Sequence, residues 1–423
     1  MTNMVKKHMV IVGGGITGVT SAYALAQQGL QVTLIEKNRY PGMETSYANG
    51  GQLSASNAEV WTHPSTIIKG LKWMLKSDAP LLMNPAPTWH KLSWMAEFVA
   101  AIPKYKDNTI ATTQLAIASR EHHLAWAKAE GIDFDHKPKG ILHIYRDKKG
   151  FDHAGEVSKL LAQGGLPRRA VTPDEMKAIE PTLQGQYYGG YFTESDSTGD
   201  IHKFTFGLAK ACERLGVKIL TEHQVLNVAS NGKTATVQVQ HAGQTETLSF
   251  DGIVICAGVH GRGLAAQLGD RLNIYPVKGY SITVGLNDEA SQAAAPQVSL
   301  LDDETKLVTS RLGADRFRVA GTAEFNGIDL DIRADRIKPL VNWVNECFPG
   351  VDTRRAEPWA GLRPMLPNML PRVGAGKKAN VFYNTGHGHL GWTLSAITAH
   401  QLAGHVMAAV QDNARSFMTP ANA

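Results

Sequence analysis

Hydrophobic and polar residues near the start of the chain change their spacing twice. Met9–Val12 is a short apolar run rich in β-branched residues, which is typical of a buried strand. From Val19 to Ala26 the apolar and small residues follow helical spacing, and this pattern stops at Gly29. A second apolar run, Val32–Ile35, follows at once. The pattern predicts a strand, a helix and a second strand, in that order.

The rest of the chain alternates between the same two patterns. Helical spacing predicts helices over residues 112–130, 152–163, 202–215, 334–348 and 394–410, and a helix start at Thr172–Glu175. Apolar runs and period-two alternation predict strands over residues 141–145, 187–192, 217–220, 224–228, 234–240, 245–250, 251–258, 275–283 and 298–321. The strands between 224 and 250, with the turn signal Asn231-Gly232, predict an antiparallel meander, and those after 275 suggest a second, larger sheet. The sequence therefore predicts an α/β fold with antiparallel sheet in addition to the opening unit.

The turn between the first strand and the first helix is rich in glycine. It reads Gly13-Gly14-Gly15, and Gly18 completes the pattern G-x-G-x-x-G. The first glycine permits a tight turn, the second lets backbone approach a pyrophosphate, and the third lets helix and strand pack closely. The helix N-terminus offers N–H groups to phosphates, and Glu36, which ends the second strand, can accept hydrogen bonds from ribose hydroxyls. Because an acid at Glu36 disfavours a 2′-phosphate, this unit predicts binding of FAD or NAD(H).

Two later stretches also suit a polar ligand. Residues 44–53, ETSYANGGQL, combine small, hydroxylated and amide residues directly after the dinucleotide unit. Residues 381–393 form a second strand and glycine turn, and the Ala-rich helix of residues 394–410 follows them. The N-terminus of that helix would face an anionic or carbonyl group.

Composition narrows the function only slightly. At 423 residues the chain is long enough for two or three domains of ~150 residues. The net charge of +5 and the pI near 8.9 permit anionic lipid or nucleic acid as a partner but require neither. The three cysteines are scattered, without metal-ligand spacing, which favours a reducing compartment over a disulfide framework. We expect no metal, no signal peptide and no membrane-spanning segment, since no run of ~18 apolar residues occurs.

The segment of residues 61–106 is rich in tryptophan and lysine and allows two interpretations. Apolar residues from Ile67 to Leu75 follow helical spacing, and Lys69, Lys72 and Lys76 share the opposite side. A basic amphipathic helix near tryptophans can lie on an anionic membrane surface. A core-facing helix with a solvated lysine face has the same pattern.

The order of these motifs resembles that of a known family. The glycine unit is followed by TSYANGGQ, DGIVICAG, YPVKGYS, GLRP and NTGHGHLGWT. Over nearly its whole length the chain resembles the D-amino-acid oxidase superfamily of flavoproteins, and within it the bacterial D-amino-acid dehydrogenases are the most similar. One departure is Asn57-Ala58-Glu59, which replaces a prolyl, aromatic stretch.

The resemblance implies a cofactor and a division into domains. The cofactor is FAD, bound non-covalently because no cysteine has a context resembling a covalent flavin link. A Rossmann-like FAD-binding domain with a β-meander is expected over residues 1–60, 195–272 and 355–415. A substrate domain of α+β type, with an antiparallel sheet roofing the flavin, is expected over residues 61–194 and 273–354.

The family's cofactor-binding positions can be carried over one by one. The glycine turn matches the pyrophosphate site, Ser46–Leu53 the loop against the flavin, Val225 the backbone near the adenine, and Gly386–Thr393 the turn at the pyrimidine end of the isoalloxazine. The residues concerned are Val12, Gly13, Gly15, Ile16, Thr17, Gly18, Glu36, Lys37, Ser46, Asn49, Gly51, Gln52, Leu53, Val225, Ala257, Gly258, Gly386, Gly388, Leu390, Gly391 and Thr393.

Three residues, Arg363, Tyr280 and His387, are the candidates for catalytic roles, and Lys278 is a fourth residue that could lie near the flavin. Arg363, in GLRP, matches the arginine that pairs with the substrate carboxylate; a structural ion pair is the alternative. Tyr280 could hydrogen-bond the same carboxylate or be a half-buried sheet tyrosine. His387 could face the flavin or the amine, or bond locally within its turn. Lys278 could be a positive group near the reduced flavin or a charge at a strand edge.

The resemblance implies oxidative deamination of D-amino acids, with hydride transfer from the α-carbon to flavin N5. The products would be a 2-oxo acid and ammonia, and a quinone or another membrane carrier would take the electrons. A cytoplasmic protein is expected, with the segment of residues 61–106 as a docking surface on the inner face of the membrane if it binds lipid. Alternatives are a cyclic or secondary amine as substrate (D-proline, a D-hydroxyproline or a sarcosine-like amine), an oxidase using O₂, or a flavoprotein subunit without activity of its own. A flavin-dependent tRNA-modifying enzyme is a remote alternative, and we expect no nucleic acid partner because the basic residues are dispersed.

Overall fold

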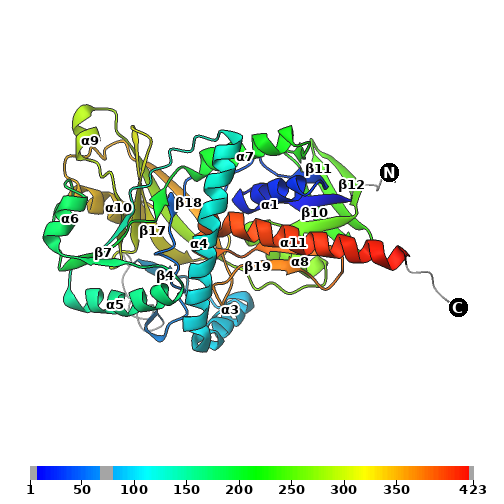
Figure 1. Ribbon diagram of the computed structural model, residues 1–423, viewed down its shortest axis with the longest axis horizontal. Helices are drawn as coiled ribbons and strands as arrows, with labels where there is room; N and C mark the ends of the chain where they lie inside the picture. The colour runs from blue at the N-terminus through cyan, green and yellow to red at the C-terminus, as the bar shows by residue number, and fades with distance from the viewer. Residues whose placement is uncertain (1–6, 67–79, 419–423) are drawn as a thin grey trace.

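The computed structural model describes residues 7–66 and 80–418, and two β-sheets dominate it. The smaller sheet and both ends of the chain lie in the right half of Figure 1, and the larger sheet lies in the left half. The predicted basic helix at residues 67–76 lies outside the described residues. Within the described residues, no helix has both the length and the apolar character needed to cross a membrane.

The smaller sheet has six strands in the order β19-β20-β13-β1-β2-β9, drawn from three separate parts of the chain. Its strands are parallel except for the edge pair β19–β20. They span β1 (His8–Val12), β2 (Gln31–Ile35), β9 (Lys218–Leu220), β13 (Gly252–Ile255), β19 (Arg372–Ala375) and β20 (Val381–Thr385). The strand–helix–strand unit at the start of the chain is confirmed, and it occupies the centre of this sheet.

Both faces of this sheet are covered, which explains why its strands are apolar throughout. One face packs against three helices, α1 (Ile16–Gln27), α7 (Ile201–Arg214) and α11 (Gly391–Met418). The other face packs against α8 (Gly261–Gln267) and a three-stranded meander of β10 (Gln224–Ser230), β11 (Ala235–His241) and β12 (Gln244–Phe250). The meander predicted from alternation and from Asn231-Gly232 is therefore present.

The larger sheet has nine strands, in the order β18-β14-β17-β16-β15-β5-β7-β6 with β4 added to β17. The predicted run over residues 298–321 is three of these strands. The strands are β4 (Leu81–Met83), β5 (Ile141–Tyr145), β6 (Arg169–Val171), β7 (Gly189–Thr193), β14 (Tyr275–Gly285), β15 (Ser299–Asp302), β16 (Leu307–Leu312), β17 (Arg316–Phe325) and β18 (Glu357–Met365). Strand β18 pairs with β14 and so lies in this sheet, whereas the expected division placed residues 355–415 in the FAD-binding domain.

The remaining elements surround the larger sheet or connect the two sheets. Helix α10 (Ala334–Cys347) packs against one face of it, and α4 (Tyr105–Glu130) crosses the middle of the molecule between the two sheets (Figure 1). Helix α4 starts earlier than the predicted residue 112 and ends, as predicted, at Gly131. The other short elements are β3 (Gln52–Leu53), β8 (Ser197–Thr198), α3 (Trp89–Ala100), α5 (Lys148–Gln163), α6 (Pro173–Ile179), α9 (Glu289–Ala294) and the 3₁₀ turns Ile102–Lys104, Gly258–His260 and Gly388–Leu390.

Candidate active site

A cavity of about 860 Å³ runs from the carboxyl ends of β1 and β2 to the inner strands of the larger sheet. Its walls come from the glycine turn after β1, the loop of residues 42–54, the turn after β13, strands β14, β17 and β18, and the turn of residues 385–393. Ligands of open parallel sheets bind at the carboxyl ends of the strands, which is where this cavity begins.

The glycine turn is shaped for close approach of a ligand. Gly13 has φ +106°, and a Cβ there would lie 2.7 Å from the carbonyl oxygen of Cys256. A Cβ at Gly18 would lie 1.8 Å from the Gly13 oxygen, so only glycine lets α1 pack against the turn. At Gly15 a Cβ would meet only Ser46 Oγ, at 3.5 Å, which leaves open space beside the start of α1. Gly15 is the N-cap of α1, and no side chain caps this end of the helix.

Glu36 stands at the end of β2 and binds the turn directly. Its carboxylate accepts from the N–H of Gly14 (2.7 Å) and from the N–H and the Nδ2 of Asn38 (2.8 and 2.7 Å). Burial raises the pKa of Glu36, and the hydrogen bonds from Asn38 and Gly14 oppose that shift. The carboxylate therefore fixes the glycine turn and also lines the cavity.

The polar loop after β2 is held from several sides. Ser46 Oγ accepts from the N–H of Ile16 (3.0 Å), and Gln52 Nε2 donates to the Leu300 carbonyl (3.1 Å). Thr45 Oγ1 donates to the Leu362 carbonyl (2.8 Å) on the larger sheet. These bonds place the loop between the glycine turn and the larger sheet.

The cavity brings together nearly all of the residues predicted to bind the cofactor. Gly18 and Leu53 are the exceptions, since Gly18 packs against the turn and Leu53 lies in the hydrophobic core beneath α1. The predicted residues that line the cavity are Val12, Gly13, Gly15, Ile16, Thr17, Glu36, Lys37, Ser46, Asn49, Gly51, Gln52, Val225, Ala257, Gly258, Gly386, Gly388, Leu390, Gly391 and Thr393.

Arg363 lies on β18 at the end of the cavity away from the glycine turn. Its Nη1 donates to the carbonyl of Thr322 (2.9 Å), and within residues 7–66 and 80–418 no carboxylate forms an ion pair with it. Burial lowers the pKa of Arg363 to about 10, so the guanidinium stays charged at neutral pH. Arg363 is half-buried, and an anionic ligand would offset the cost of a partly desolvated cation without a counter-ion.

The side chains of Tyr280 and Lys278 lie on the face of β14 opposite to that of Arg363. On β14 they alternate with Val277 and Gly279, and Val277 is the cross-strand partner of Arg363. Because successive side chains of a strand point to opposite faces, Tyr280 and Lys278 project away from Arg363. The Tyr280 hydroxyl donates to Glu324 (2.8 Å), and Tyr280 is also among the residues that line the cavity, so its role as a second partner of the substrate carboxylate stays a prediction. Lys278 is fully buried, so it is neither a charge at an exposed strand edge nor part of the cavity wall.

His387 lines the cavity, but its side chain bonds toward α11. Its Nε2 lies 3.0 Å from Thr398 Oγ1, and its Nδ1 has no hydrogen-bond partner among the described residues. Burial lowers the pKa of His387 to about 3, so the imidazole is neutral under ordinary conditions. The hydrogen bond fits the local interpretation, and a catalytic role for His387 stays a prediction.

Several residues at the substrate end were not predicted. His389 and Trp61 line the cavity with ring centroids 5.0 Å apart, and His389 Nε2 lies 3.2 Å from the carbonyl of Asn57. Burial lowers the pKa of His389 to about 4, and the charges of Arg363 and Lys306 add to that shift. Glu59 also lines the cavity and accepts from the Tyr105 hydroxyl (2.6 Å). The only sequence signal was that the Asn57-Ala58-Glu59 stretch departs from its family's pattern.

Known proteins match this chain over most of its length. A family model described as DAO, FAD dependent oxidoreductase, matches residues 8–404. The chain is 60% identical over 395 residues to D-amino acid dehydrogenase 3 of Mesorhizobium japonicum, covering 93% of this chain and 96% of the relative. It is 40% identical over 404 residues to D-amino acid dehydrogenase of Dechloromonas aromatica, covering 93% and 96%.

Solved structures show the same fold at low sequence identity. Glycine oxidase from Geobacillus kaustophilus superposes with a TM-score of 0.72 at 20% identity, covering 95% of each chain. L-proline dehydrogenase from P. horikoshii gives a TM-score of 0.71 at 17% identity, covering 94% of this chain and 92% of the other. Fold and cavity together define a flavin-dependent oxidoreductase with a dinucleotide-binding sheet and a separate roofing sheet. The chain belongs to the DAO family of FAD-dependent oxidoreductases, and FAD is its cofactor.

The residues present fit this cofactor. The space beside Gly15 and the uncapped start of α1 suit a pyrophosphate, and the cavity continues from there to Arg363. Two residues that line the cavity, Gln52 and Thr385, have buried oxygens (Oε1 and Oγ1) without hydrogen-bond partners in the described part of the chain. Buried polar atoms are normally bonded, so these two atoms are consistent with a polar ligand beside them.

Proposed function

We propose that this flavoenzyme oxidises D-amino acids, by way of the imino acid, to 2-oxo acids and ammonia, and passes the electrons to an acceptor other than oxygen. Arg363 carries this proposal, because it is a half-buried guanidinium that lines the cavity without a carboxylate partner in the described chain. A guanidinium of this kind recognises a carboxylate through two parallel hydrogen bonds. The relative that is 60% identical is named a D-amino acid dehydrogenase, which supports an α-amino acid of D configuration.

The chain's own residues supply binding and orientation. When bound, FAD supplies the two-electron acceptance that converts an amine into an imine. We assign its pyrophosphate to the turn of Gly13–Gly18, its ribose to Glu36, and its ring system to the space between the loop of residues 46–53 and the turn of residues 386–393. Arg363 would fix the substrate carboxylate at two points, which limits the ways in which the α-carbon can face the ring.

A panel of amino acids tests the substrate class. The holoenzyme is mixed with D- and L-amino acids, D-proline and sarcosine without oxygen, and the flavin absorbance is followed. We expect D-amino acids to bleach the flavin and their L-enantiomers to leave it oxidised. Bleaching by L-amino acids alone would contradict the proposal, and bleaching by the secondary amines alone would replace its substrate class.

The same preparation tests the acceptor. The bleached enzyme is mixed either with air-saturated buffer or with an anaerobic solution of a water-soluble quinone. We expect rapid reoxidation by the quinone and slow reoxidation by oxygen. Reoxidation by oxygen within seconds would identify an oxidase.

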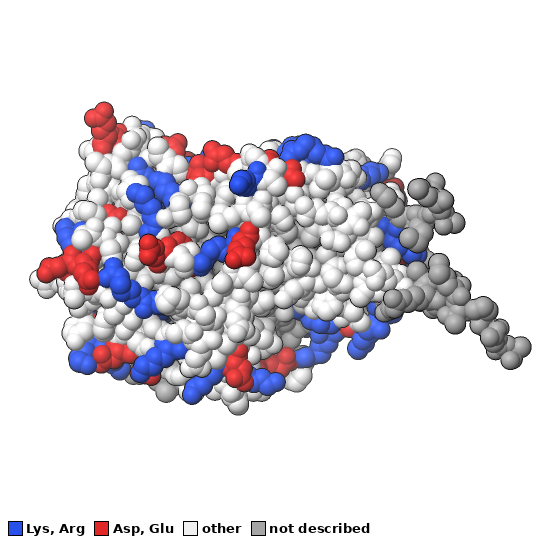
Figure 2. All heavy atoms as spheres, viewed as in Figure 1, with Lys and Arg blue, Asp and Glu red and all other residues white. Residues whose placement is uncertain are grey.

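A peripheral membrane contact is the second part of the proposal, and α3 supports it. Trp89, Leu92, Met95 and Val99 lie on one side of this helix and are exposed, Trp89 to 81% of its surface. An apolar stripe with a tryptophan at its end suits the interface of a bilayer. On the face drawn in Figure 2, positive and negative side chains are interspersed, which indicates no large basic patch on that face.

Flotation of the holoenzyme with vesicles that contain anionic lipid tests this contact. Trp89→Ser should reduce the floated fraction severalfold. Tyr188→Ser is the matched control, because Tyr188 is an exposed aromatic residue outside α3 and its loss should leave flotation unchanged. Equal flotation of the wild-type and Trp89→Ser proteins would move the contact away from this helix.

A further inference from the structure

The guanidinium of Arg363 contacts an irregularity in the pairing of strands β14 and β17. Between β14 and β17, Lys278 pairs with Glu324 and Tyr280 pairs with Gly321. Gly279 alone therefore faces two residues, Thr322 and Ala323, which is the arrangement of a β-bulge. Thr322 has φ +57°, a left-handed conformation that a β-branched residue adopts only when the surrounding structure imposes it.

The guanidinium of Arg363 rests on both sides of this bulge. Its Nη1 donates to the carbonyl of Thr322 (2.9 Å). A Cβ on Gly279 would lie 2.4 Å from both terminal nitrogens of Arg363, so the guanidinium occupies the space that the missing side chain leaves. The position of the charge in the cavity therefore depends on the conformation of the bulge.

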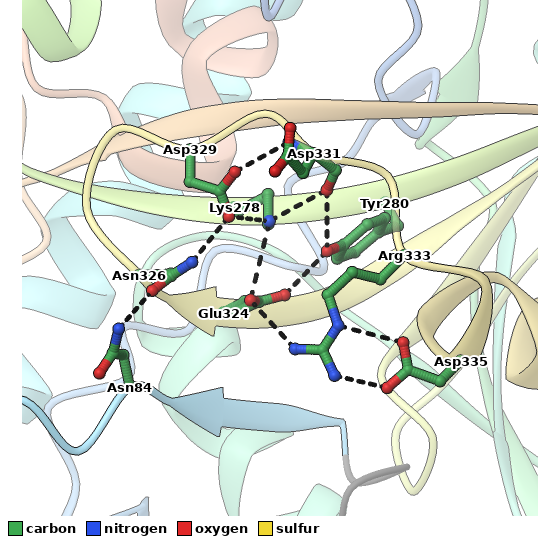
Figure 3. Close-up of polar contacts among 9 residues, drawn as sticks. All are labelled: Asn84, Lys278, Tyr280, Glu324, Asn326, Asp329, Asp331, Arg333 and Asp335. Carbon is green, nitrogen blue, oxygen red and sulfur yellow. Dashed lines mark hydrogen bonds and ion pairs between the residues drawn. The ribbon is translucent and has the colours of Figure 1, made fainter.

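The reverse face of the sheet holds a carboxylate that binds both residues flanking the bulge. Glu324 accepts from the Tyr280 hydroxyl (2.8 Å), and its other oxygen lies 3.7 Å from Lys278 Nζ. Figure 3 shows Glu324 between Lys278, Tyr280 and Arg333. Glu324 is buried, and neither it nor Lys278 lines the cavity.

The segment after β17 supplies further partners for Lys278. Asp329 Oδ2 lies 2.5 Å from Lys278 Nζ, and the carbonyl of Asp331 accepts from the same ammonium group (3.1 Å). Asn326 Nδ2 donates to Asp329 (2.7 Å) (Figure 3). A buried ion pair adds little net stability, but it can select one arrangement of the chain over another.

We propose that Glu324 is a positioning residue for the substrate carboxylate: by binding Lys278 and Tyr280 behind the sheet, it fixes the bulge on which Arg363 rests. A slip of one residue would remove the bulge, turn Thr322 out of its left-handed conformation and withdraw the carbonyl that orients the guanidinium. This inference rests on the proposed function, because it takes Arg363 as the partner of the carboxylate.

Glu324→Gln tests the role, with the affinity for a simple carboxylate and the steady-state constants as readouts. Glutamine keeps an acceptor for Tyr280 but loses the charge opposite Lys278. We expect the Kd of the carboxylate and the KM of the D-amino acid to rise ~10-fold or more, with kcat at saturation changed less, because misplacement of a binding group by about 1 Å has effects of this size. FAD content should remain unchanged.

Asp302→Asn is the matched control. Asp302 is a buried carboxylate in the same sheet, bound to one cation, Arg146, and to one aromatic donor, Trp343 Nε1 (2.9 Å). Its loss should lower the melting temperature as much as Glu324→Gln does and leave the KM within about twofold of the wild type. An equal rise of KM in both variants would reduce Glu324 to a structural role and overturn the inference.

A second substitution tests the bulge itself. Thr322→Gly keeps the carbonyl and removes the conformational cost of φ +57°, since glycine adopts that conformation freely. Added to Glu324→Gln, it should recover a large part of the lost carboxylate affinity. Unchanged affinity in the double variant would contradict the inference. If Glu324→Gln does not fold, Tyr280→Phe removes one of the two contacts alone and should raise the same Kd about threefold; an unchanged Kd in Tyr280→Phe would then overturn the inference.

Arg363→Gln separates this inference from the proposed function. If Arg363→Gln weakens carboxylate binding and Glu324→Gln does not, only the positioning role is wrong. If Arg363→Gln leaves carboxylate binding unchanged, the carboxylate site lies elsewhere and both proposals fail.

Discussion

The two ends of the cavity recognise their ligands by different means. At the nucleotide end much of the wall comes from one short stretch, residues 12–46, which includes the glycine turn Gly13–Gly15. At the substrate end the charge of Arg363 depends on Gly279 and Thr322, which lie on two other strands far away in the sequence. The first end follows from local sequence, and the second depends on how strands pair.

The largest expected effect is at the substrate end. Arg363→Ala should lower kcat/KM for a D-amino acid by a factor that corresponds to about 3 kcal/mol or more of transition-state stabilisation, because a charge-assisted pair with the carboxylate is lost. FAD content should stay at the wild-type level, since the nucleotide end does not contact this residue. Stopped-flow reduction of the flavin by the D-amino acid measures the loss in kcat/KM, and the flavin absorbance of the purified protein measures the FAD content. A near-normal kcat/KM would place the carboxylate elsewhere.

This contrast also explains what could be predicted from the sequence. The opening unit and the meander were predicted because each depends on a few neighbouring residues with fixed spacing. Nearly all of the residues that the family resemblance assigns to the cofactor line one cavity. The hydrogen bond from Tyr280 to Glu324 could not be predicted, because YPVKGYS does not reveal which face of β14 meets the cavity. The bulge at Gly279 and the pairing of β18 with β14 depend on strand register, which no local pattern in this chain encodes.

The second effect concerns the nucleotide end. Gly15→Val would place two methyl groups in the space beside the start of α1, where a pyrophosphate approaches. Overpacking of this kind costs about 1–3 kcal/mol, so the Kd for FAD should rise ~10- to 100-fold and the purified protein should be largely colourless.

Gly15→Ala is its control, because a single Cβ there meets only Ser46 Oγ, at 3.5 Å. The alanine variant should keep its flavin, and carboxylate binding in the reconstituted valine variant should be normal. A yellow valine variant with normal flavin absorbance would contradict the pyrophosphate assignment.

The third effect is a pH dependence of stability that differs between the two ends. The pKa of buried His387 lies at about 3, below the value of ~6.5 in an unfolded chain. Its contribution to stability is therefore complete above pH 6.5 and is lost as the pH falls toward 3, by about 1.4 kcal/mol for each pH unit. At the nucleotide end burial raises the pKa of Glu36, so its contribution changes in the opposite direction on acidification.

Urea unfolding at pH 6.5 and pH 5.5 measures how much His387 contributes to the change in the free energy of unfolding. The wild-type protein should lose about 1 kcal/mol more than His387→Gln over this interval, because the unfolded histidine takes up a proton and glutamine does not titrate. Equal losses in the two proteins would mean that the pKa of His387 is the same in the folded and unfolded states.

The smallest effect tests whether the nucleotide end depends on any single side chain. Glu36→Gln removes a desolvated charge, which favours the variant, but it turns an amide toward the N–H groups of Gly14 and Asn38. One of these donors loses its acceptor, so FAD binding should weaken by only about 1 kcal/mol. Titration of the apoprotein with FAD measures this change, and Asn38→Ala, which removes the amide bond to the same carboxylate, gives the reference. A loss of about 3 kcal/mol in FAD binding, the size expected for kcat/KM in Arg363→Ala, would show that a side chain dominates recognition at this end as well, and not the backbone of the glycine turn.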